Sequence, residues 1–284
     1  MTGSWKWKLP REVDVMNGVK MPQYVRPVYD QEEVAKFLAT TSAEGDPNVA
    51  LIVSQVPVGL DRLVFGEFMM VKTRKNLDEN PRVASLAVTE KLEMAGFKAE
   101  VVDWVQSGPY IDRINNIEFF RYNAYAGIHN AAVMVVRDIL PLPTRVSYPA
   151  FVRDFVMVRA AGGCRDEGGV EIPGPVADKL NGIMVVKVLA FQGEDGYPGI
   201  VPVFAARTCA KGMVRFKVTG YNRSLERLDL PARVAINVLT MDLLTYQVKG
   251  ELLRFEKARG VLTGVVRVDE VYSSIPPLVG ERIV

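Results

Sequence analysis

The chain has 284 residues, of which 49% are hydrophobic and 24% are charged, and its formal net charge is +2. This composition is globular, and a charge so close to neutral argues against broad electrostatic capture of nucleic acid or of an anionic membrane. No apolar run reaches the roughly 18–20 residues of a membrane span. The stretch Met1–Lys20 lacks the apolar core of a signal peptide, so we expect a cytoplasmic protein.

The first half of the chain opens with an irregular lead-in over residues 1–28. Asp30 followed by Glu33 has the spacing of a capping box and predicts a short helix over Gln31–Phe37. Apolar runs separated by turn residues then predict strands. They lie at Leu38–Thr41, Val49–Val53, Leu63–Met70, Val83–Val88, Gly96–Trp104 and Ala131–Ile139, with a helix over Thr73–Glu79.

The second half repeats this order after a Pro- and Gly-rich linker, residues 141–174. Within the linker, Val152–Val158 suits either a strand or a helix. We predict helices over Pro175–Leu180, which Gly182 would end, and over Ser224–Leu230. The predicted strands are Val185–Phe191, Ile200–Ala205, Met213–Val218, Val234–Leu239, Tyr246–Phe255 and Val261–Val271.

The two halves align with each other at a constant offset of 151 residues, Lys36–Val101 over Lys187–Leu252. Turn residues, apolar alternation and a basic-plus-hydroxyl pair all keep register. Such a period fits one small domain rather than a solenoid unit. We therefore predict domains at 29–140 and 175–284. Each would be a mainly β, six-stranded antiparallel barrel with short helices, and the pair would form an intramolecular pseudo-dimer.

The first copy carries about 21 extra residues between its last two strands. They include an amphipathic run, Tyr110–Tyr122, with Ile114, Ile117 and Phe120 near helical spacing. This run suits either cover for the core or a lid over a pocket.

Few residues of the chain suit metal or thiol chemistry. Cys164 and Cys209 are far apart and form no C-x-x-C motif, so we expect reduced, incidental thiols. His129 is the only histidine, which leaves little for a histidine-based metal site, and we expect a local loop role for it.

The segment Lys72-Thr73-Arg74-Lys75-Asn76 follows a predicted strand and opens a predicted helix. The first turn of a helix offers unpaired N–H groups and a partial positive charge. With its cations, this turn suits an anion, best a phosphate. A solvated basic helix start is the alternative. The second copy keeps Arg223 and Ser224 but has Leu225 and Glu226 next, so its site would be weaker.

The run Phe68–Val83, with its basic-hydroxyl cluster, Asn-Leu and Asn-Pro-Arg-Val, resembles the flavin-phosphate segment of the pyridoxamine-5′-phosphate-oxidase-like FMN-binding split barrels. The turn Glu44–Val49 and the strand Tyr246–Gly250 are similar to other motifs of that family. The resemblance covers roughly residues 30–140 and 175–272.

The resemblance implies a split barrel that dimerises, with FMN across the interface. Lys72 and Thr73 would then bind the phosphate with Asn76 nearby, Ser54 would approach the isoalloxazine ring, and Lys98 would lie on a later strand. Arg223 and Ser224 would serve a second cleft. There, Arg227 replaces Asn76 and Leu230-Pro231 replaces Asn-Pro, which puts FMN in doubt.

Several functions remain open at this stage. A flavin oxidoreductase acting on a small organic substrate is our first hypothesis, and flavin chemistry requires no acid or base, so we name no catalytic residue. A non-catalytic flavin binder, a deazaflavin or haem protein, and a cofactor-free interaction protein are the alternatives. Haem would need His129 or a non-histidine ligand. Further homodimerisation of whole chains is compatible with all of them.

Overall fold

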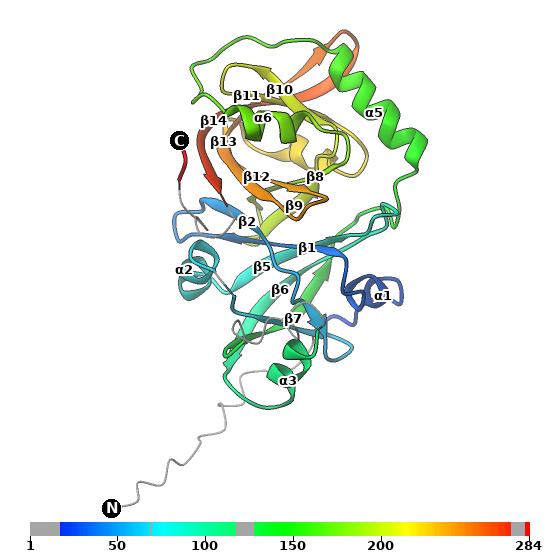
Figure 1. The fold of residues 1–284 in the computed structure, drawn as a ribbon, viewed down its shortest axis with the longest axis vertical. Helices are drawn as coiled ribbons and strands as arrows, with labels where there is room; N and C mark the ends of the chain where they lie inside the picture. Colours follow the sequence, from blue (N-terminus) through cyan, green and yellow to red (C-terminus); the bar gives the residue numbers. More distant parts are fainter. Residues whose placement is uncertain (1–17, 69, 118–127, 274–281) are drawn as a thin grey trace, which may run out of the picture.

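The computed structural model describes residues 18–68, 70–117, 128–273 and 282–284. Within these ranges the strands form two antiparallel seven-stranded sheets, one in each half of the chain (Figure 1). The mainly β, tandem architecture predicted from the sequence is therefore confirmed, with seven strands in each sheet where six were expected. Among the described residues, no helix is both long and apolar enough to cross a bilayer.

The first sheet has the strand order β2-β1-β5-β6-β7-β4-β3. Its strands are β1 (Ala35–Thr41), β2 (Pro47–Leu51), β3 (Val56–Pro57), β4 (Arg62–Gly66), β5 (Arg82–Val88), β6 (Met94–Val105) and β7 (Ala131–Ile139). The helices beside it are α1 (Val25–Tyr29), α2 (Lys72–Glu79) and α3 (Pro109–Asn115).

The second sheet has the corresponding order β10-β11-β14-β13-β12-β8-β9. Its strands are β8 (Val185–Gln192), β9 (Pro198–Pro202), β10 (Ala206–Ala210), β11 (Met213–Lys217), β12 (Ala232–Thr240), β13 (Thr245–Ala258) and β14 (Val261–Ser273). α5 (Tyr148–Ala160), α6 (Gly174–Asn181) and the 3-10 helix η2 (Arg223–Arg227) accompany it. Val152–Val158 is thus helical.

The halves keep the sequence register of the repeat in three dimensions. The amide of Ile52 donates to the carbonyl of Lys36, and 151 residues later the amide of Val203 donates to the carbonyl of Lys187. Leu92 and Leu243, also 151 apart, both have a φ of 58°. An equal offset in strand pairing and in a rare backbone conformation marks two copies of one fold.

The expected helix over Gln31–Phe37 is wrong. The helix, α1, lies earlier in the chain, and β1 begins at Ala35. β1 lies between β2 and β5, and consecutive residues on it enter different cores. Leu38 faces the interior of its own barrel, whereas Phe37 and Ala39 join a cluster shared with the second half. Burial on both faces favours a strand over the local capping signal.

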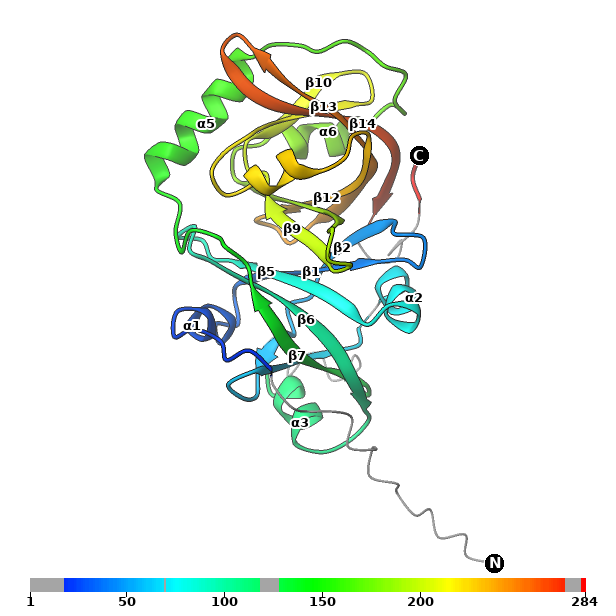
Figure 2. The same cartoon turned by 180° about the vertical axis from the view of Figure 1, so that it is seen from behind.

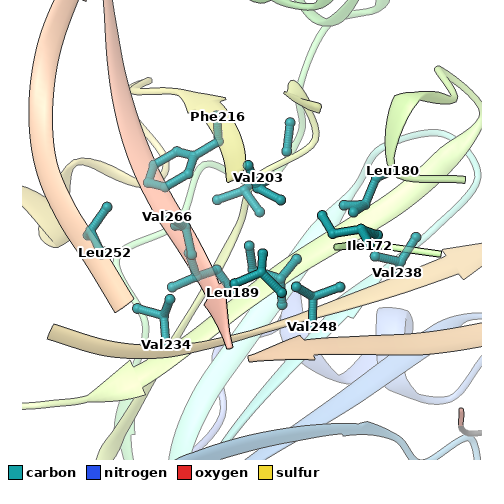
Figure 3. Close-up of a cluster of buried hydrophobic side chains, with 14 of the residues drawn as sticks. Ile172, Leu180, Leu189, Val203, Phe216, Val234, Val238, Val248, Leu252 and Val266 are labelled. Atoms are coloured by element: carbon teal, nitrogen blue, oxygen red, sulfur yellow. The ribbon is translucent and has the colours of Figure 1, made fainter. Parts of the chain in front are cut away.

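The shared cluster joins the barrels. It contains Phe37 and Leu86 of the first half together with Val188, Ile200 and Ala235 of the second. The second barrel has its own separate interior, where Leu189, Phe216 and Val266 pack together (Figure 3). The two halves are therefore two barrels with a common apolar interface.

Polar contacts cross this interface in a pseudo-twofold pattern. Asp46, in the turn before β2, pairs with Lys249 and Arg233 of the other half. Conversely, Asp195, in the turn before β9, pairs with Lys98 at 2.5 Å. Lys98 and Lys249 occupy equivalent positions in the two copies. Each barrel therefore forms an ion pair with the hairpin turn of the other.

The expectation of two reduced cysteines is wrong. Cys164 and Cys209 form a disulfide with their Cα atoms 5.2 Å apart. The amide of Cys164 also donates to the carbonyl of Cys209 at 3.1 Å, because the segment after α5 runs beside β10. The pairing across 45 residues depends on this long-range contact, which the spacing of the cysteines does not show.

Candidate functional site: a cleft between the two barrels

A cavity of about 820 Å³ lies where the two barrels meet. The first half lines it with β2, the segment after β2 and the start of α2. The second half contributes β12, the start of β13 and the end of β14. In Figures 1 and 2, α2, β2 and the end of β14 come together at this junction. The cavity is lined by both copies, so neither barrel alone would form it.

Lys72 and Thr73 begin α2 and line the cavity. The Nζ atom of Lys72 is buried, has no hydrogen-bond partner among the described residues, and lies over the ring of Tyr272. Burial, and next the nearby charge of Lys249, lower the pKa of Lys72 to about 7. A buried amine without an acceptor is costly, and an anion at the helix start would supply one.

Thr73 is held by a polar network that crosses the interface. Asn48 on β2 donates through Nδ2 to Oγ1 of Thr73 at 3.1 Å. Gln247 on β13 in turn donates through Nε2 to Oδ1 of Asn48 at 3.1 Å and to the carbonyl of Val49 at 2.8 Å. All three side chains are buried. The second barrel thus fixes the helix start of the first.

Ser54 also lines the cavity, in the short segment that joins the two outer strands of the first sheet, β2 and β3. Its buried Oγ accepts a hydrogen bond from the amide of Gly66 at 3.0 Å. This bond ties the segment to the end of β4. The counterpart of Ser54 in the second copy is Ala205, which cannot make the bond.

The structure places Asn76 and Lys98 outside the cavity lining. Asn76 is buried and donates to Oγ1 of Thr40 at 3.0 Å, so it holds α2 against β1. Lys98 pairs with Asp195 on the opposite side of the pseudo-dimer. Its counterpart Lys249 is the one whose charge acts on Lys72.

The helix start carries less positive charge at the cavity than the sequence indicated. Arg74 lies over the ring of Trp104 and pairs with Glu67 at 2.9 Å and Asp78 at 3.0 Å. Lys75 is exposed and is not part of the lining. Lys72 is therefore the only basic side chain that lines this cavity among the described residues.

Sequence reasoning did not assign Gln247 and Tyr272 to this site, although both line the cavity from the second half. It also missed Lys249, which lies outside the lining but whose charge acts on Lys72. The signal was available for Lys249, because it aligns with Lys98 and a dimer-like arrangement exchanges such strands between sites. Nothing in the spacing pointed to Tyr272.

The equivalent cleft on the other side is largely occupied by the chain itself, and a cavity of about 280 Å³ remains beside Tyr221. Phe204 and Tyr221, the counterparts of Val53 and Met70, pack against each other with ring centroids 5.7 Å apart. Phe151 of α5 packs on Phe204 at 5.8 Å, and Val146 of the linker joins the same cluster. In Figure 2 the linker runs from the end of β7 past this side of the junction to α5. The two clefts are therefore not equivalent.

Arg223 and Ser224 do not line the cavity between the barrels. The short helix η2 replaces the longer helix predicted there. The Arg223 side chain is 74% exposed and pairs with Glu226 of the same turn at 3.1 Å.

His129 is exposed and does not line the cavity. The described residues contain no group of three or more His, Cys, Asp or Glu side chains that could hold a metal ion. In the amphipathic insertion, Ile114 is buried in a cluster under β4 and β7, and Ile117 both joins that cluster and lines the cavity. Phe120 lies outside the described residues.

No protein-family model and no curated protein matches this chain. Solved structures do match. An FMN-binding protein from Syntrophomonas wolfei subsp. wolfei is 23% identical over 42% of this chain and 84% of that chain, with a TM-score of 0.37. A putative pyridoxamine 5′-phosphate oxidase from Lactobacillus delbrueckii is 16% identical over 44% of this chain and 98% of that chain, with a TM-score of 0.35.

A third match, YcgR from Escherichia coli in complex with c-di-GMP, is 11% identical over 85% of this chain and 79% of that chain, with a TM-score of 0.25. This chain thus resembles FMN-binding split-barrel proteins in its motifs and again among solved structures. Likeness of this degree says nothing about a cofactor or an activity.

Proposed function

We propose that the cleft between the barrels binds FMN, and that the chain is a flavoprotein, with oxidoreductase activity on a small organic substrate as the proposed activity. The observation that carries this proposal is the buried Nζ of Lys72 at the start of α2, which has no hydrogen-bond acceptor within the part of the chain that the structure describes. The amides of the first helical turn and the Thr73 hydroxyl lie beside it. A phosphate supplies the missing acceptor and suits the partial positive charge of a helix start.

The rest of the cleft also fits a flavin. Its volume falls within the roughly 300–1,000 Å³ typical of small-ligand sites. Ser54, Phe68 and Ile52 line it, which combines apolar surface with a few polar groups. When bound, FMN would supply the redox chemistry. The chain would hold the phosphate, orient the ring and exclude water.

The experiment is a titration of the purified whole chain with FMN and, separately, with riboflavin, followed by flavin fluorescence. We expect saturation at one FMN per chain, because the second cleft is filled, and at least about tenfold weaker binding of riboflavin, which lacks the phosphate. Equal binding of the two, or no flavin binding, would contradict the proposal.

Activity is tested separately. Turnover of a nicotinamide donor by the FMN-loaded chain would support an oxidoreductase. A loaded chain that turns over no donor would support the non-catalytic alternative.

A further inference from the structure

One part of the cleft has a composition that a flavin phosphate site does not require. Val186, Leu239, Met241 and Leu243 of the second half line the cavity together, and we call them the apolar rim. Met241 and Leu243 are 58% and 61% exposed. Two large apolar side chains that remain open to solvent while lining a cavity indicate surface available to a ligand.

The rim lies at a distance from the helix start. Leu243 is in the turn between β12 and β13, four residues before Gln247, which binds next to Thr73. Thr245–Gln247 are extended, at about 3.3 Å per residue, and with the turn residue Leu244 they put Leu243 and Gln247 on the order of 10 Å apart. The rim and the anion site are thus separate parts of one cleft. The cavity volume, near the upper end of the range for single ligands, leaves room for a second molecule.

The conformation of Leu243 adds a second observation. Its φ of 58° is disfavoured for a bulky side chain. Its counterpart Leu92 has the same φ but is only 8% exposed. Leu92 shares an apolar cluster with Val146 and Phe151, and the amide of Val146 donates to its carbonyl at 2.9 Å.

The filled cleft therefore shows which kind of surface packs on the leucine at this position of the fold. There, the leucine is covered by an apolar stretch of the chain. In the open cleft the same residue keeps the disfavoured backbone and remains largely exposed. An apolar ligand would give Leu243 the cover that Leu92 already has.

Charge restricts the ligand further. Glu32, Glu33 and Glu90 line the same cavity, while Lys72 is at the helix start. Carboxylates around the opening disfavour a second anion, by a modest amount because these side chains are exposed and screened.

We propose that the apolar rim binds the apolar part of a second, uncharged organic molecule, the substrate, beside the flavin. This inference rests on the proposed function in one respect, that the flavin occupies the part of the cleft next to Lys72.

The test uses two probes with one skeleton, neutral N-phenyl-1-naphthylamine and its anionic analogue 8-anilino-1-naphthalenesulfonate. Equilibrium dialysis against the whole chain, with and without saturating FMN, measures their binding. We expect the neutral probe to bind in both conditions and, once FMN saturates the anion site, the sulfonate to bind about fivefold or more weakly. Exclusion of the neutral probe by FMN, or equal binding of the two probes at saturating FMN, would overturn the proposal.

Leu243→Gly removes the side chain and leaves the turn conformation unchanged, so it tests the side chain alone. Glycine accepts a positive φ, so the melting temperature should not fall, while the affinity for the neutral probe should drop about five- to tenfold. Met241→Glu, which installs the residue found at the counterpart position Glu90, should lower it as well. Leu60→Ala, at a residue that is 60% exposed and outside the cavity lining, is the control and should change nothing.

Unchanged affinity for the neutral probe in both rim variants would overturn the proposal that the apolar rim binds it. The flavin proposal fails separately. A chain that binds the neutral probe but no FMN would contradict the flavin site and leave the rim standing. A chain that binds FMN but not the neutral probe would contradict the rim alone.

Discussion

The two sides of the pseudo-dimer began with one fold and differ in what occupies the groove between the barrels. On one side, Val53 and Met70 leave a cavity of about 820 Å³ next to Lys72. On the other, Phe204 and Tyr221 at the matching positions fill the groove with Phe151 of the linker helix. A pair of larger side chains and one connecting segment put packed aromatic side chains where the other side has a cavity. Duplication within one chain permits this, because each copy can change independently.

The largest difference between the two sides should be in stability. Phe204→Ala removes an aromatic side chain from the filled groove, where it is 1% exposed, and should cost about 3–5 kcal/mol of unfolding free energy. Val53→Ala, at the matching position in the open cleft, should cost about 1 kcal/mol or less, because Val53 is only half-buried. Denaturant unfolding of both variants checks this. Equal losses would mean that the open cleft is packed as a core too.

Ligand affinity should show the opposite asymmetry. Lys72→Ala combined with Thr73→Ala should weaken FMN binding by about 2–4 kcal/mol, the sum of a charged and a neutral hydrogen bond. The matched double variant, Arg223→Ala with Ser224→Ala, should leave binding nearly unchanged, because Arg223 is exposed and pairs with Glu226. Flavin titration measures both. A comparable loss in the second variant would show that the wrong cleft has been assigned.

The two halves can also be compared through the pH dependence of stability that their buried lysines cause. Lys36 and Lys187 are counterparts, and burial lowers the pKa of Lys36 to about 8 and of Lys187 to about 7. An unfolded lysine keeps its proton up to about pH 10.4. Between these values the unfolded state binds more protons, so each lysine makes stability rise with pH.

The gain in unfolding free energy of Lys187→Met over the native chain should therefore be largest at and below about pH 7. Its advantage should shrink by up to about 1.4 kcal/mol per pH unit above that. Lys36→Met should show the same change starting about one unit higher. Unfolding free energies between pH 6.5 and 9.5 test this. A constant difference between variant and native chain across that range would contradict the lowered pKa.

The last expected effect, with the same limit per pH unit, concerns the pH dependence of FMN binding at the anion site. Because the pKa of Lys72 without ligand is about 7, the amine loses its charge above that pH. FMN affinity should then fall with pH, by at most about tenfold per unit. In Lys72→Met this decline should disappear. A native chain whose FMN affinity is flat from pH 7 to 9 would mean that Lys72 does not contact the phosphate.

The sequence by itself determined the architecture. The constant offset between Lys36–Val101 and Lys187–Leu252 is enough to predict two copies, since turns and apolar alternation are local signals that any copy of the fold repeats. The same local signals located Lys72 and Thr73 at a helix start and Ser54 between strands. For Asn76 and Lys98, whose surroundings come from distant segments, the family resemblance implied cofactor-binding roles, and the structure places both outside the cavity lining.

Only the tertiary structure decided what each side of the molecule contains. The end of the predicted helix over Gln31–Phe37 is part of strand β1. This strand is buried on both faces, because one face packs against the other barrel. Three further features depend on segments far apart in the chain. They are the Cys164–Cys209 disulfide, the presence of Lys249 rather than Lys98 near Lys72, and the packing of Phe151 on Phe204 in one groove. Spacing along a sequence records local geometry, whereas these contacts form only when the two barrels and their linker pack together.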